Sequence, residues 1–310
     1  MKLNIVIPCY NEEAVLRETN SQILALLDSC LQEGLAQSCD VIYVDDGSND
    51  RTWDMIKELQ QSVDYVHGIK LAHNVGHQNA LWAGYMYSVD KCDAVVSVDA
   101  DLQQDIWKIK DMLKAYYDGC EIVYGVRNNR ETDSGFKKRT AGAFYGLMRK
   151  MGVDLIPNHA DFRLVGKKAL KALSEYPERN LFLRGLVRTL GFKETIVYFD
   201  CGDRLAGKSK YTFAKMFGLA TDGITSFSVQ PLHVISLMGF FIMFLSIVFG
   251  IYSIVAYFCG QTVRGWTSLL TVISFFGGVQ MLCIGVLGEY IGKIYKEVKR
   301  RPLYIIESTI

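Results

Sequence analysis

Two long stretches without a charged residue constrain this 310-residue chain more than any other feature. The first runs from Leu232 to Phe258 and the second from Trp266 to Gly288. About 20 apolar residues suffice to cross the core of a bilayer, and the core helices of globular proteins seldom run that far without a charge. We therefore predict two membrane-spanning helices, at 232–258 and 266–291. A pair of buried core helices is the alternative.

The basic residues around these stretches indicate an orientation in the membrane. The short connection Cys259–Gly265 contains a single one, Arg264. The segment after the second stretch contains five: Lys293, Lys296, Lys299, Arg300 and Arg301. Because Lys and Arg gather on the cytoplasmic side, we expect a basic cytoplasmic tail at 292–310. With two spans, the residues before Leu232 are then cytoplasmic too, and the protein is placed in the inner, cytoplasmic membrane.

Composition narrows the class of partner and the compartment. The chain has 34 Lys and Arg against 33 Asp and Glu, so it lacks the basic excess typical of duplex-binding surfaces, and we expect no nucleic acid partner. The eight cysteines are scattered without a Cys-x-x-Cys pair, which weakens both a zinc site and a disulfide framework. Reduced thiols fit a cytosolic compartment. The strand pattern from Met1 to Pro8 leads us to expect no signal peptide.

The first 210 residues alternate short apolar runs with longer amphipathic stretches. The apolar runs are Leu3–Ile7, Val41–Val44, Val66–Leu71, Ala94–Val98 and Ile122–Val126. Stretches such as Glu13–Leu31 and Thr52–Gln61 have helical spacing. This alternation predicts an α/β domain with a mostly parallel sheet, whose ligands bind outside the carboxyl ends of the strands.

The segment between this domain and the first apolar stretch, residues 211–231, is moderately apolar. Lys215 and Asp222 are its only charged residues. This composition is typical of amphipathic juxtamembrane helices that lie along a bilayer surface. A helix packed against the α/β domain is an equal alternative.

Two carboxylates follow the apolar run 94–98. Asp99 and Asp101 are two residues apart, so at the end of a strand they would project to the same side. Such hard oxygen ligands suit Mg²⁺ or Mn²⁺, which could hold a diphosphate. For an isolated pair of this kind, an acidic turn with local hydrogen bonds is the simpler interpretation.

Polar loops also follow the other predicted strands. The first two are Pro8–Glu13 and Asp45–Asp50, where carboxylates could accept hydrogen bonds from a nucleoside and Gly47 would allow close backbone approach. Taken alone, Asp-Gly-Ser is also a common turn. The third loop contains Gly76 and leads into a helix whose amino terminus could face an anion. We do not expect His73 and His77 to bind a metal, because no carboxylate follows at ligand spacing.

Two basic segments could contact phosphate. The first contains Arg127, Arg130, Lys137, Lys138 and Arg139. It could form a clamp that orders around a phosphate, although for Arg130, Lys137 and Lys138 we favour a solvated loop. The second, Arg204–Tyr211, lies just before the membrane region, where it could meet anionic headgroups or a lipid-borne phosphate.

These motifs, in this order, resemble the family 2 glycosyltransferases of GT-A fold. More narrowly, the chain is similar to the membrane-anchored polyprenyl-phosphate glycosyltransferases, which include bactoprenol glucosyltransferases and dolichol-phosphate mannose synthases. The matching residues are Val6–Glu13, Val44–Ser48, Asn74, Gly76, Asp99–Gln103, Asp161–Leu164, Arg204, Gly207 and Ser209–Tyr211. Ile224–Phe227 and Gly285–Gly292 extend the likeness through both spans and favour the bactoprenol branch. One departure is Gln103-Gln104-Asp105, where many relatives have Gln-Asp-Pro.

The resemblance implies a GT-A catalytic domain at 1–210 that transfers a hexose, with inversion, to undecaprenyl or another polyprenyl phosphate at the cytoplasmic face. The product would be a lipid-linked sugar for modification of a cell-envelope glycan. We expect UDP-glucose as donor, with UDP-N-acetylglucosamine or GDP-mannose as alternatives. A non-catalytic membrane-assembly subunit is the alternative from another class, and the resemblance also points to a homo-oligomer, a tetramer. A processive synthase is disfavoured, because the chain has no Gln-x-x-Arg-Trp motif.

The resemblance also implies roles for individual residues. The Mg²⁺ or Mn²⁺ ligands would be Asp99, Asp101 and Gln103. The nucleotide-binding residues would be Pro8, Tyr10, Asn11, Glu12, Asp45, Asp46, Gly76, Asp99 and Ala100. The phosphate and acceptor contacts would be Arg127, Arg139, Arg204, Ser209 and Lys210. The catalytic residues would be Asp161, Arg163 and Asp101.

Asp161 stands at the position that the family comparison marks for a catalytic base. The second pKa of a phosphate monoester is about 6, so the acceptor is largely ionised at neutral pH and needs little deprotonation. We therefore expect Asp161 to position the acceptor or the sugar, with support from Arg163.

Overall fold

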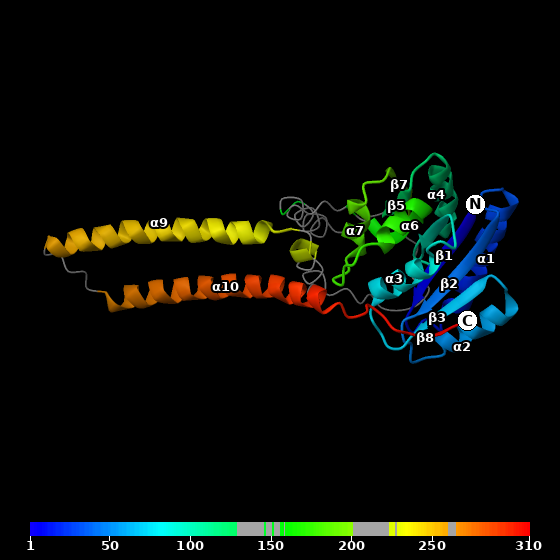
Figure 1. The fold of residues 1–310 in the computed structure, drawn as a ribbon, viewed down its shortest axis with the longest axis horizontal. Helices are drawn as coiled ribbons and strands as arrows, with labels where there is room; N and C mark the ends of the chain where they lie inside the picture. The colour runs from blue at the N-terminus through cyan, green and yellow to red at the C-terminus, as the bar shows by residue number, and fades with distance from the viewer. Residues whose placement is uncertain are drawn as a thin grey trace.

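The structure, a computed structural model, describes residues 1–128, 159–200, 223–226, 228–259 and 265–310, together with residues 146, 151, 156 and 157. Within these residues an α/β domain carries two long helices, which extend from one end of it side by side (Figure 1).

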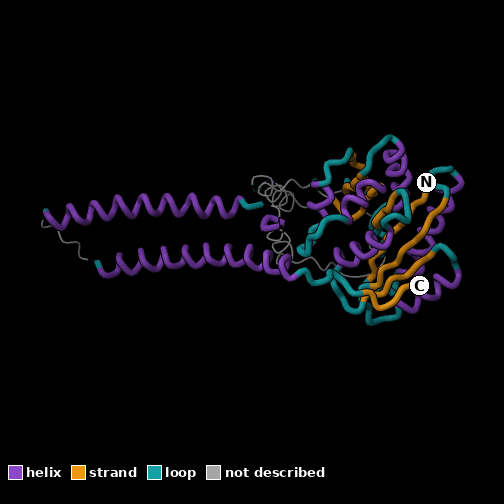
Figure 2. Tube along the Cα trace, in the orientation of Figure 1, coloured by secondary structure: helices purple, strands orange, loops and turns teal. Residues whose placement is uncertain are grey.

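Eight strands within the described residues form one sheet, in the order β7-β5-β6-β4-β1-β2-β3-β8. Figure 2 shows the strands in orange within the α/β domain. The strands are β1 (Lys2–Cys9), β2 (Ser38–Asp45), β3 (Val66–Leu71), β4 (Ala94–Ser97), β5 (Ile122–Arg127), β6 (His159–Gly166), β7 (Glu194–Phe199) and β8 (Ile306–Thr309). β1 to β4 run parallel to one another, and β5 is parallel to β7. β6 is antiparallel to both of its neighbours, and β8 is antiparallel to β3. The predicted mostly parallel sheet is confirmed.

Helices cover both faces of the sheet, which explains why its central strands are apolar almost throughout. The helices of the domain are α1 (Leu16–Gln32), α2 (Thr52–Ser62), α3 (His77–Ser88), the short 3₁₀ helix η1 (Ile106–Lys108), α4 (Ile109–Tyr117), α6 (Lys167–Ser174) and α7 (Leu183–Thr189). Side chains alternate along β1: Ile5 and Ile7 belong to the core with α1, α2 and α4, whereas Val6 belongs to the core with α3, α6 and α7.

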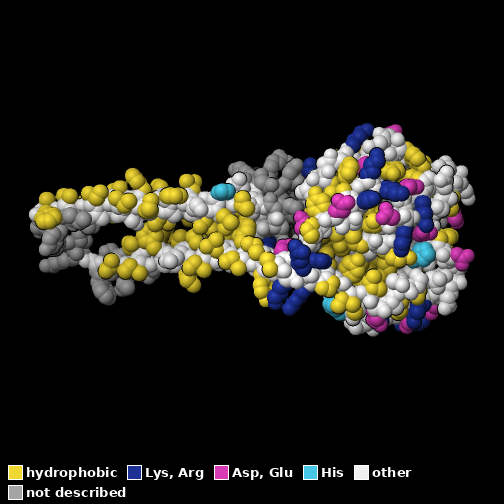
Figure 3. Space-filling view, viewed as in Figure 1, with side chains coloured by type: hydrophobic (Ala, Val, Ile, Leu, Met, Phe, Trp, Pro, Cys, Tyr) yellow, Lys and Arg dark blue, Asp and Glu magenta, His cyan; other side chains and the backbone are white. Residues whose placement is uncertain are grey.

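The two uncharged stretches form the helices α9 (Gln230–Phe258) and α10 (Trp266–Lys299). Both are long and apolar enough to cross a membrane, over Gln230–Tyr252 and Phe275–Lys299. Their large apolar side chains are exposed along most of their length (Figure 3). Core helices would bury these side chains, so the interpretation as a membrane hairpin fits better than the alternative.

The segment expected as a basic tail at 292–310 forms two ordered elements. α10 continues to Lys299, and β8 then joins the open edge of β3. Ile310 and Gly68 exchange backbone N–H···O bonds of 2.9 and 3.0 Å beyond the end of β8. The sequence gives little sign of this strand, because it is only four residues long and pairs with a segment far away in the chain. The chain therefore returns to the α/β domain after its second apolar helix.

The juxtamembrane prediction falls mainly outside the described residues. Within 211–231, the structure describes a helical turn at 223–226 and residues 228–231, of which Gln230 begins α9.

Candidate active site

The polar motifs meet at one edge of the sheet, as expected for parallel strands. β1, β2 and β4 all end there, and β6 starts there because it runs antiparallel to β4. Ser97 of β4 pairs with Arg163 of β6. This register places Asp161, two residues before Arg163, beside Asp99, two residues after Ser97. The antiparallel strand thus adds a third carboxylate to the two that follow β4.

Two arginines hold the Asp161 carboxylate. Arg163 is fully buried, and its Nη2 donates to Asp161 Oδ1 while its Nη1 donates to the backbone oxygen of Leu183 at 3.2 Å. Arg184 of α7 donates from Nε to Oδ1 at 3.2 Å and from Nη2 to Oδ2 at 3.0 Å. The Arg163 side chain is fully buried where it contacts Asp161. The Arg184 side chain keeps 28% of its surface exposed.

The charges around Asp161 decide its protonation. Burial by itself raises the pKa of a carboxyl group, but Arg184, Arg163 and His77 together hold the pKa of Asp161 well below its usual range. A carboxylate with so low a pKa is a poor proton acceptor near neutral pH. This electrostatic setting agrees with the expected positioning role better than with a base.

Asp99 lies in a different setting, although it is next to Asp161. Its Oδ2 accepts a hydrogen bond of 2.6 Å from Gln104 Nε2, and its backbone N–H donates to Gln104 Oε1 at 3.0 Å. Burial raises the pKa of Asp99, Asp161 and Asp101 add to the rise, and His77 and Arg127 oppose it. Gln104, the residue that departs from the family pattern, therefore fixes the first carboxylate of the pair.

His77 lies between the two carboxylates. Its Nε2 is 3.6 Å from Asp99 Oδ1 and 3.7 Å from Asp161 Oδ2. It is the first residue of α3, directly after Gly76, whose φ of +90° is the left-handed conformation that glycine adopts most readily. From the sequence, we did not expect His77 to bind a metal, and we assigned it no other role. The structure brings it into the site, where it acts to lower the pKa of both carboxylates.

The residues that follow β4 fit a divalent cation that arrives with its phosphate ligands. No group of three or more His, Cys, Asp or Glu side chains in the described part of the chain is arranged to enclose a metal. Mg²⁺ commonly uses one or two carboxylates and completes its shell with water and substrate phosphates. Asp101 Oδ1 accepts a hydrogen bond of 3.2 Å from the Gln103 N–H within the local turn. Leu102 has a φ of +51°, a strained conformation that is common at functional sites.

Asp45 and Asp46, predicted together as nucleotide contacts, differ in their hydrogen bonding. Asp46 accepts from the backbone N–H groups of Val75 at 2.7 Å and Gly76 at 3.0 Å, so it holds the loop that leads into α3. Asp45 accepts from the Ser48 N–H at 3.2 Å through Oδ1, and its Oδ2 is buried without a hydrogen bond among the described residues. Burial raises the pKa of both. Asp45 is the one with an acceptor oxygen to offer a ligand.

The loop after β1 is tied to the loop after β2. Asn11, with a φ of +55°, donates its N–H to Ser48 Oγ and accepts from the Asn49 N–H. The Glu12 N–H donates to Thr52 Oγ1. Pro8 is buried in β1, whereas Tyr10 is exposed. Tyr10 therefore lies at the surface, in a loop that is held in place on its C-terminal side.

Gly47 is required by the packing of these loops. A Cβ at this position would lie 2.7 Å from the backbone carbon of His73, and the φ of Gly47 is +65°. The turn after β2 therefore lies directly against the loop that leads to His77.

The predicted phosphate contacts are only partly described. Arg127 ends β5, and its Nε is buried without a hydrogen bond among the described residues. Arg139, Arg204, Ser209 and Lys210 lie outside the described residues. Ala100 is buried beside the two carboxylates, and its backbone oxygen accepts from Thr19 Oγ1.

Three residues of the site were not predicted from the sequence: His77, Gln104 and Arg184. Arg184 is 23 positions from its partner Asp161, and α7 has no motif that marks it. Gln104 was visible only as a departure from a pattern. His77 was visible next to Gly76, but the position of β6 had to be known before it could be paired with a carboxylate.

Comparison with known proteins shows which family the chain is similar to. The profile of the family Glycosyl transferase family 2 matches residues 4–174, and that of the GtrB C-terminal hairpin matches residues 230–294. An uncharacterized glycosyltransferase of Bacillus subtilis (strain 168), YkoT, is 51% identical over 98% of this chain and 91% of its own length. A bactoprenol glucosyl transferase of Shigella phage SfII is 37% identical over 100% of this chain and 98% of its own length.

Proposed function

The chain belongs to glycosyltransferase family 2, and on this premise we propose that it transfers glucose from UDP-glucose to a polyprenyl phosphate at the cytoplasmic face of a membrane. The observation that carries the proposal is the joining of the carboxylate site at the sheet edge to a membrane hairpin in one chain. The similarity to a relative named bactoprenol glucosyl transferase extends over both parts of this chain. An acceptor that is both lipid and phosphate needs both parts.

The donor nucleoside binds at the ends of β1 and β2. The buried Oδ2 of Asp45, which has no hydrogen bond among the described residues, accepts from an N–H of the base or a ribose hydroxyl. The exposed Tyr10 ring stacks on the base. The backbone contacts of Asn11 and Glu12 fix the loop after β1, and Asp46 fixes the loop at Gly76.

The diphosphate lies at the end of β4. Asp99, Asp101 and Gln103 would hold Mg²⁺ or Mn²⁺, which supplies Lewis-acid stabilisation of the departing nucleoside diphosphate. Gln104 keeps the Asp99 carboxylate in one orientation through its two hydrogen bonds. Arg127, whose charge opposes the rise in the pKa of Asp99, contributes positive charge to the phosphates.

The acceptor oxygen attacks the anomeric carbon from the side opposite the diphosphate. The new bond joins this phosphate oxygen to the sugar carbon, the bond from that carbon to the diphosphate breaks, and the configuration inverts. The phosphate is largely ionised already, since its second pKa is about 6. Asp161, held ionised by Arg163 and Arg184, accepts hydrogen bonds from sugar hydroxyls and orients the donor. No proton has to reach this weakly basic carboxylate.

The membrane hairpin delivers the acceptor to this site. α9 and α10 expose apolar side chains where a polyprenyl chain and lipids would contact them. The basic residues that follow the second apolar stretch favour the cytoplasmic side for the α/β domain. On that side the nucleotide sugar is available. A homo-oligomer, as the family resemblance implies, would pack through these helices.

The test is transfer of radiolabel to lipid. The purified chain is incubated with Mg²⁺, undecaprenyl phosphate and, in separate reactions, labelled UDP-glucose, UDP-N-acetylglucosamine and GDP-mannose. We expect labelled lipid with UDP-glucose and its loss in Asp101→Asn. Asp105→Asn is the matched control, because Asp105 caps η1 within the described residues and asparagine caps equally well. No labelled lipid with any donor would refute the proposed function, and label from another donor would correct the donor.

A further inference from the structure

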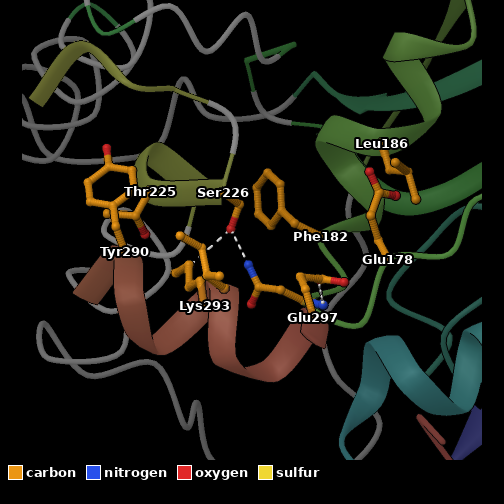
Figure 4. A pocket seen from close by; sticks show the side chains of 10 residues that line it. Glu178, Phe182, Leu186, Thr225, Ser226, Tyr290, Lys293 and Glu297 are labelled. Atoms are coloured by element: carbon orange, nitrogen blue, oxygen red, sulfur yellow. Dashed lines mark hydrogen bonds between the residues drawn. The ribbon is translucent and has the colours of Figure 1, made fainter. Parts of the chain in front are cut away.

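A cavity of about 300 Å³ lies where the membrane hairpin meets the α/β domain (Figure 4). α10 contributes Tyr290, Lys293 and Glu297, which at spacings of three and four lie on one face of the helix. The other walls are the helical turn at 223–226 and the beginning of α7. This is the junction through which α10 contacts the catalytic domain.

Glu297 makes the most direct contact across this junction. Its carboxylate accepts the Arg179 N–H at 2.9 Å with each oxygen, and the Asn180 N–H at 2.6 Å. Residues 175–182 form neither helix nor strand, so such contacts decide where this segment lies. Hydrogen bonds from backbone N–H groups to a carboxylate are among the stronger ones in proteins. α10 therefore fixes the segment that leads into α7.

Further hydrogen bonds hold the same junction. Lys293 Nζ donates to Ser226 Oγ at 2.9 Å, and Asn180 Nδ2 also donates to Ser226 Oγ. Tyr290 Oη donates to the backbone oxygen of Ser228 at 2.6 Å. Tyr290, Lys293 and Glu297 of α10 thus all form hydrogen bonds at this junction.

α7 is the wall between the junction and the active site. Phe182, at its start, and Leu186 line the cavity. Arg184, between them, points to Asp161 with two hydrogen bonds. The start of α7 is also held from the catalytic side, where the Leu183 N–H donates to Gln78 Oε1 at 2.9 Å. A shift of segment 175–182 would thus displace the guanidinium group that aligns Asp161.

We infer that Glu297 is a positioning residue, through which membrane helix α10 sets the alignment of Arg184 with Asp161. This inference rests on the proposed function, because it assigns a role in the transfer step to a residue outside the active site. Glu297 is not among the residues assigned above to the donor or to the acceptor. It acts through the backbone of Arg179 and Asn180 and then through α7.

The decisive variant is Glu297→Gln, which keeps the size of the side chain and removes its charge. We expect kcat to fall about tenfold, because small misplacement of a positioning group costs this much or more, while the Kd for UDP and the KM for the donor stay unchanged. Hydrogen exchange of the α7 amides should become faster. Glu289→Gln is the matched control, since Glu289 is exposed on the same helix. We expect it to equal the wild-type chain in all four measurements.

A double variant separates positioning from general destabilisation. If Glu297 acts through Arg184, Glu297→Gln combined with Arg184→Gln loses no more activity than Arg184→Gln alone. Losses that multiply would overturn the inference, and so would a kcat for Glu297→Gln equal to that of Glu289→Gln. UDP binding at full stoichiometry shows that the variants are folded.

The exchange measurement keeps this inference distinct from the proposed function. If the wild-type chain labels no lipid, the proposed function fails, and α7 exchange with and without the Glu297 carboxylate still decides the coupling. Unchanged exchange in Glu297→Gln would overturn it, and faster exchange confined to 175–190 would support it.

Discussion

Replacement of Arg184 by glutamine tests the electrostatic account of the site most directly. The variant removes two charge-assisted hydrogen bonds, of 3.2 and 3.0 Å, from a carboxylate that is only 11% exposed. Hydrogen bonds to charged groups contribute about 1.5–3 kcal/mol, and two on one carboxylate do not add fully, so we take this range for the pair. Since about 1.4 kcal/mol is a factor of ten, kcat should fall roughly 10- to 150-fold.

The assay is the initial rate of lipid labelling at saturating donor and acceptor. Arg188→Gln is the matched control, because Arg188 lies on the same helix and pairs with Glu194 at 3.3 Å instead of Asp161. We expect that variant to stay within about twofold of wild type, as for a partly exposed ion pair. Equal kcat values for the two variants would refute the role given to Arg184.

The same variant has a signature in stability against pH. Burial opposes ionisation of Asp161, but Arg184 and Arg163 lower its native pKa well below the unfolded value of about 3.9. The resulting stabilisation is fully present above the unfolded pKa and is lost as pH falls through the native pKa. The difference in thermal stability between wild type and Arg184→Gln should therefore be greatest near neutral pH and shrink below about pH 4. A difference that grows in acid would contradict this assignment.

Three further predictions concern other parts of the chain. Asp45→Asn should raise the Kd for UDP, measured by calorimetry, about tenfold, because asparagine offers a weaker acceptor. Asp46→Asn should mainly lower thermal stability, because it weakens the hydrogen bond that holds the loop at Val75. Chelation with EDTA should abolish lipid labelling, and added Mg²⁺ or Mn²⁺ should restore it; full activity in excess EDTA would exclude a metal role. Removing residues 306–310 should lower the melting temperature by several degrees and expose Gly68 to hydrogen exchange, since β3 loses its edge partner; an unchanged melting temperature would show that β8 adds no stability.

The parts of the fold that could be predicted are those that local sequence patterns indicate. The strands of the parallel sheet are apolar runs buried on both faces, so Val66–Leu71 has the same bounds in sequence and structure. Asp99 and Asp101 could be placed because they directly follow such a run. The positions of α9 and α10 could be predicted because both helices contain long stretches without charge, as a bilayer would require.

Contacts between distant segments decided the parts that were missed. The position of β6 between β4 and β5 brings Asp161 to Asp99, and no pattern near either residue indicates that pairing. The pairing of Arg184 with Asp161 depends on the same position of β6, so it could not be predicted either. The contact of Glu297 with Arg179 spans 118 positions, and in the sequence Glu297 is simply one charge in a basic segment. Strand β8 was missed because its partner is separated from it by most of the chain.

Strand β8 also determines when the catalytic sheet is finished during synthesis. Ribosomes add about 5–20 residues per second, so roughly 10 to 50 seconds separate the emergence of β3 from that of β8. During this interval the backbone groups along the edge of β3 are open to pairing with other chains. Lys70, which later pairs with Glu307 at 2.9 Å, is a charge of the kind that discourages such pairing. Both apolar helices, α9 and α10, precede β8 in the chain and are therefore synthesised before it. A nascent chain thus completes the sheet of the catalytic domain only after both apolar helices have been made.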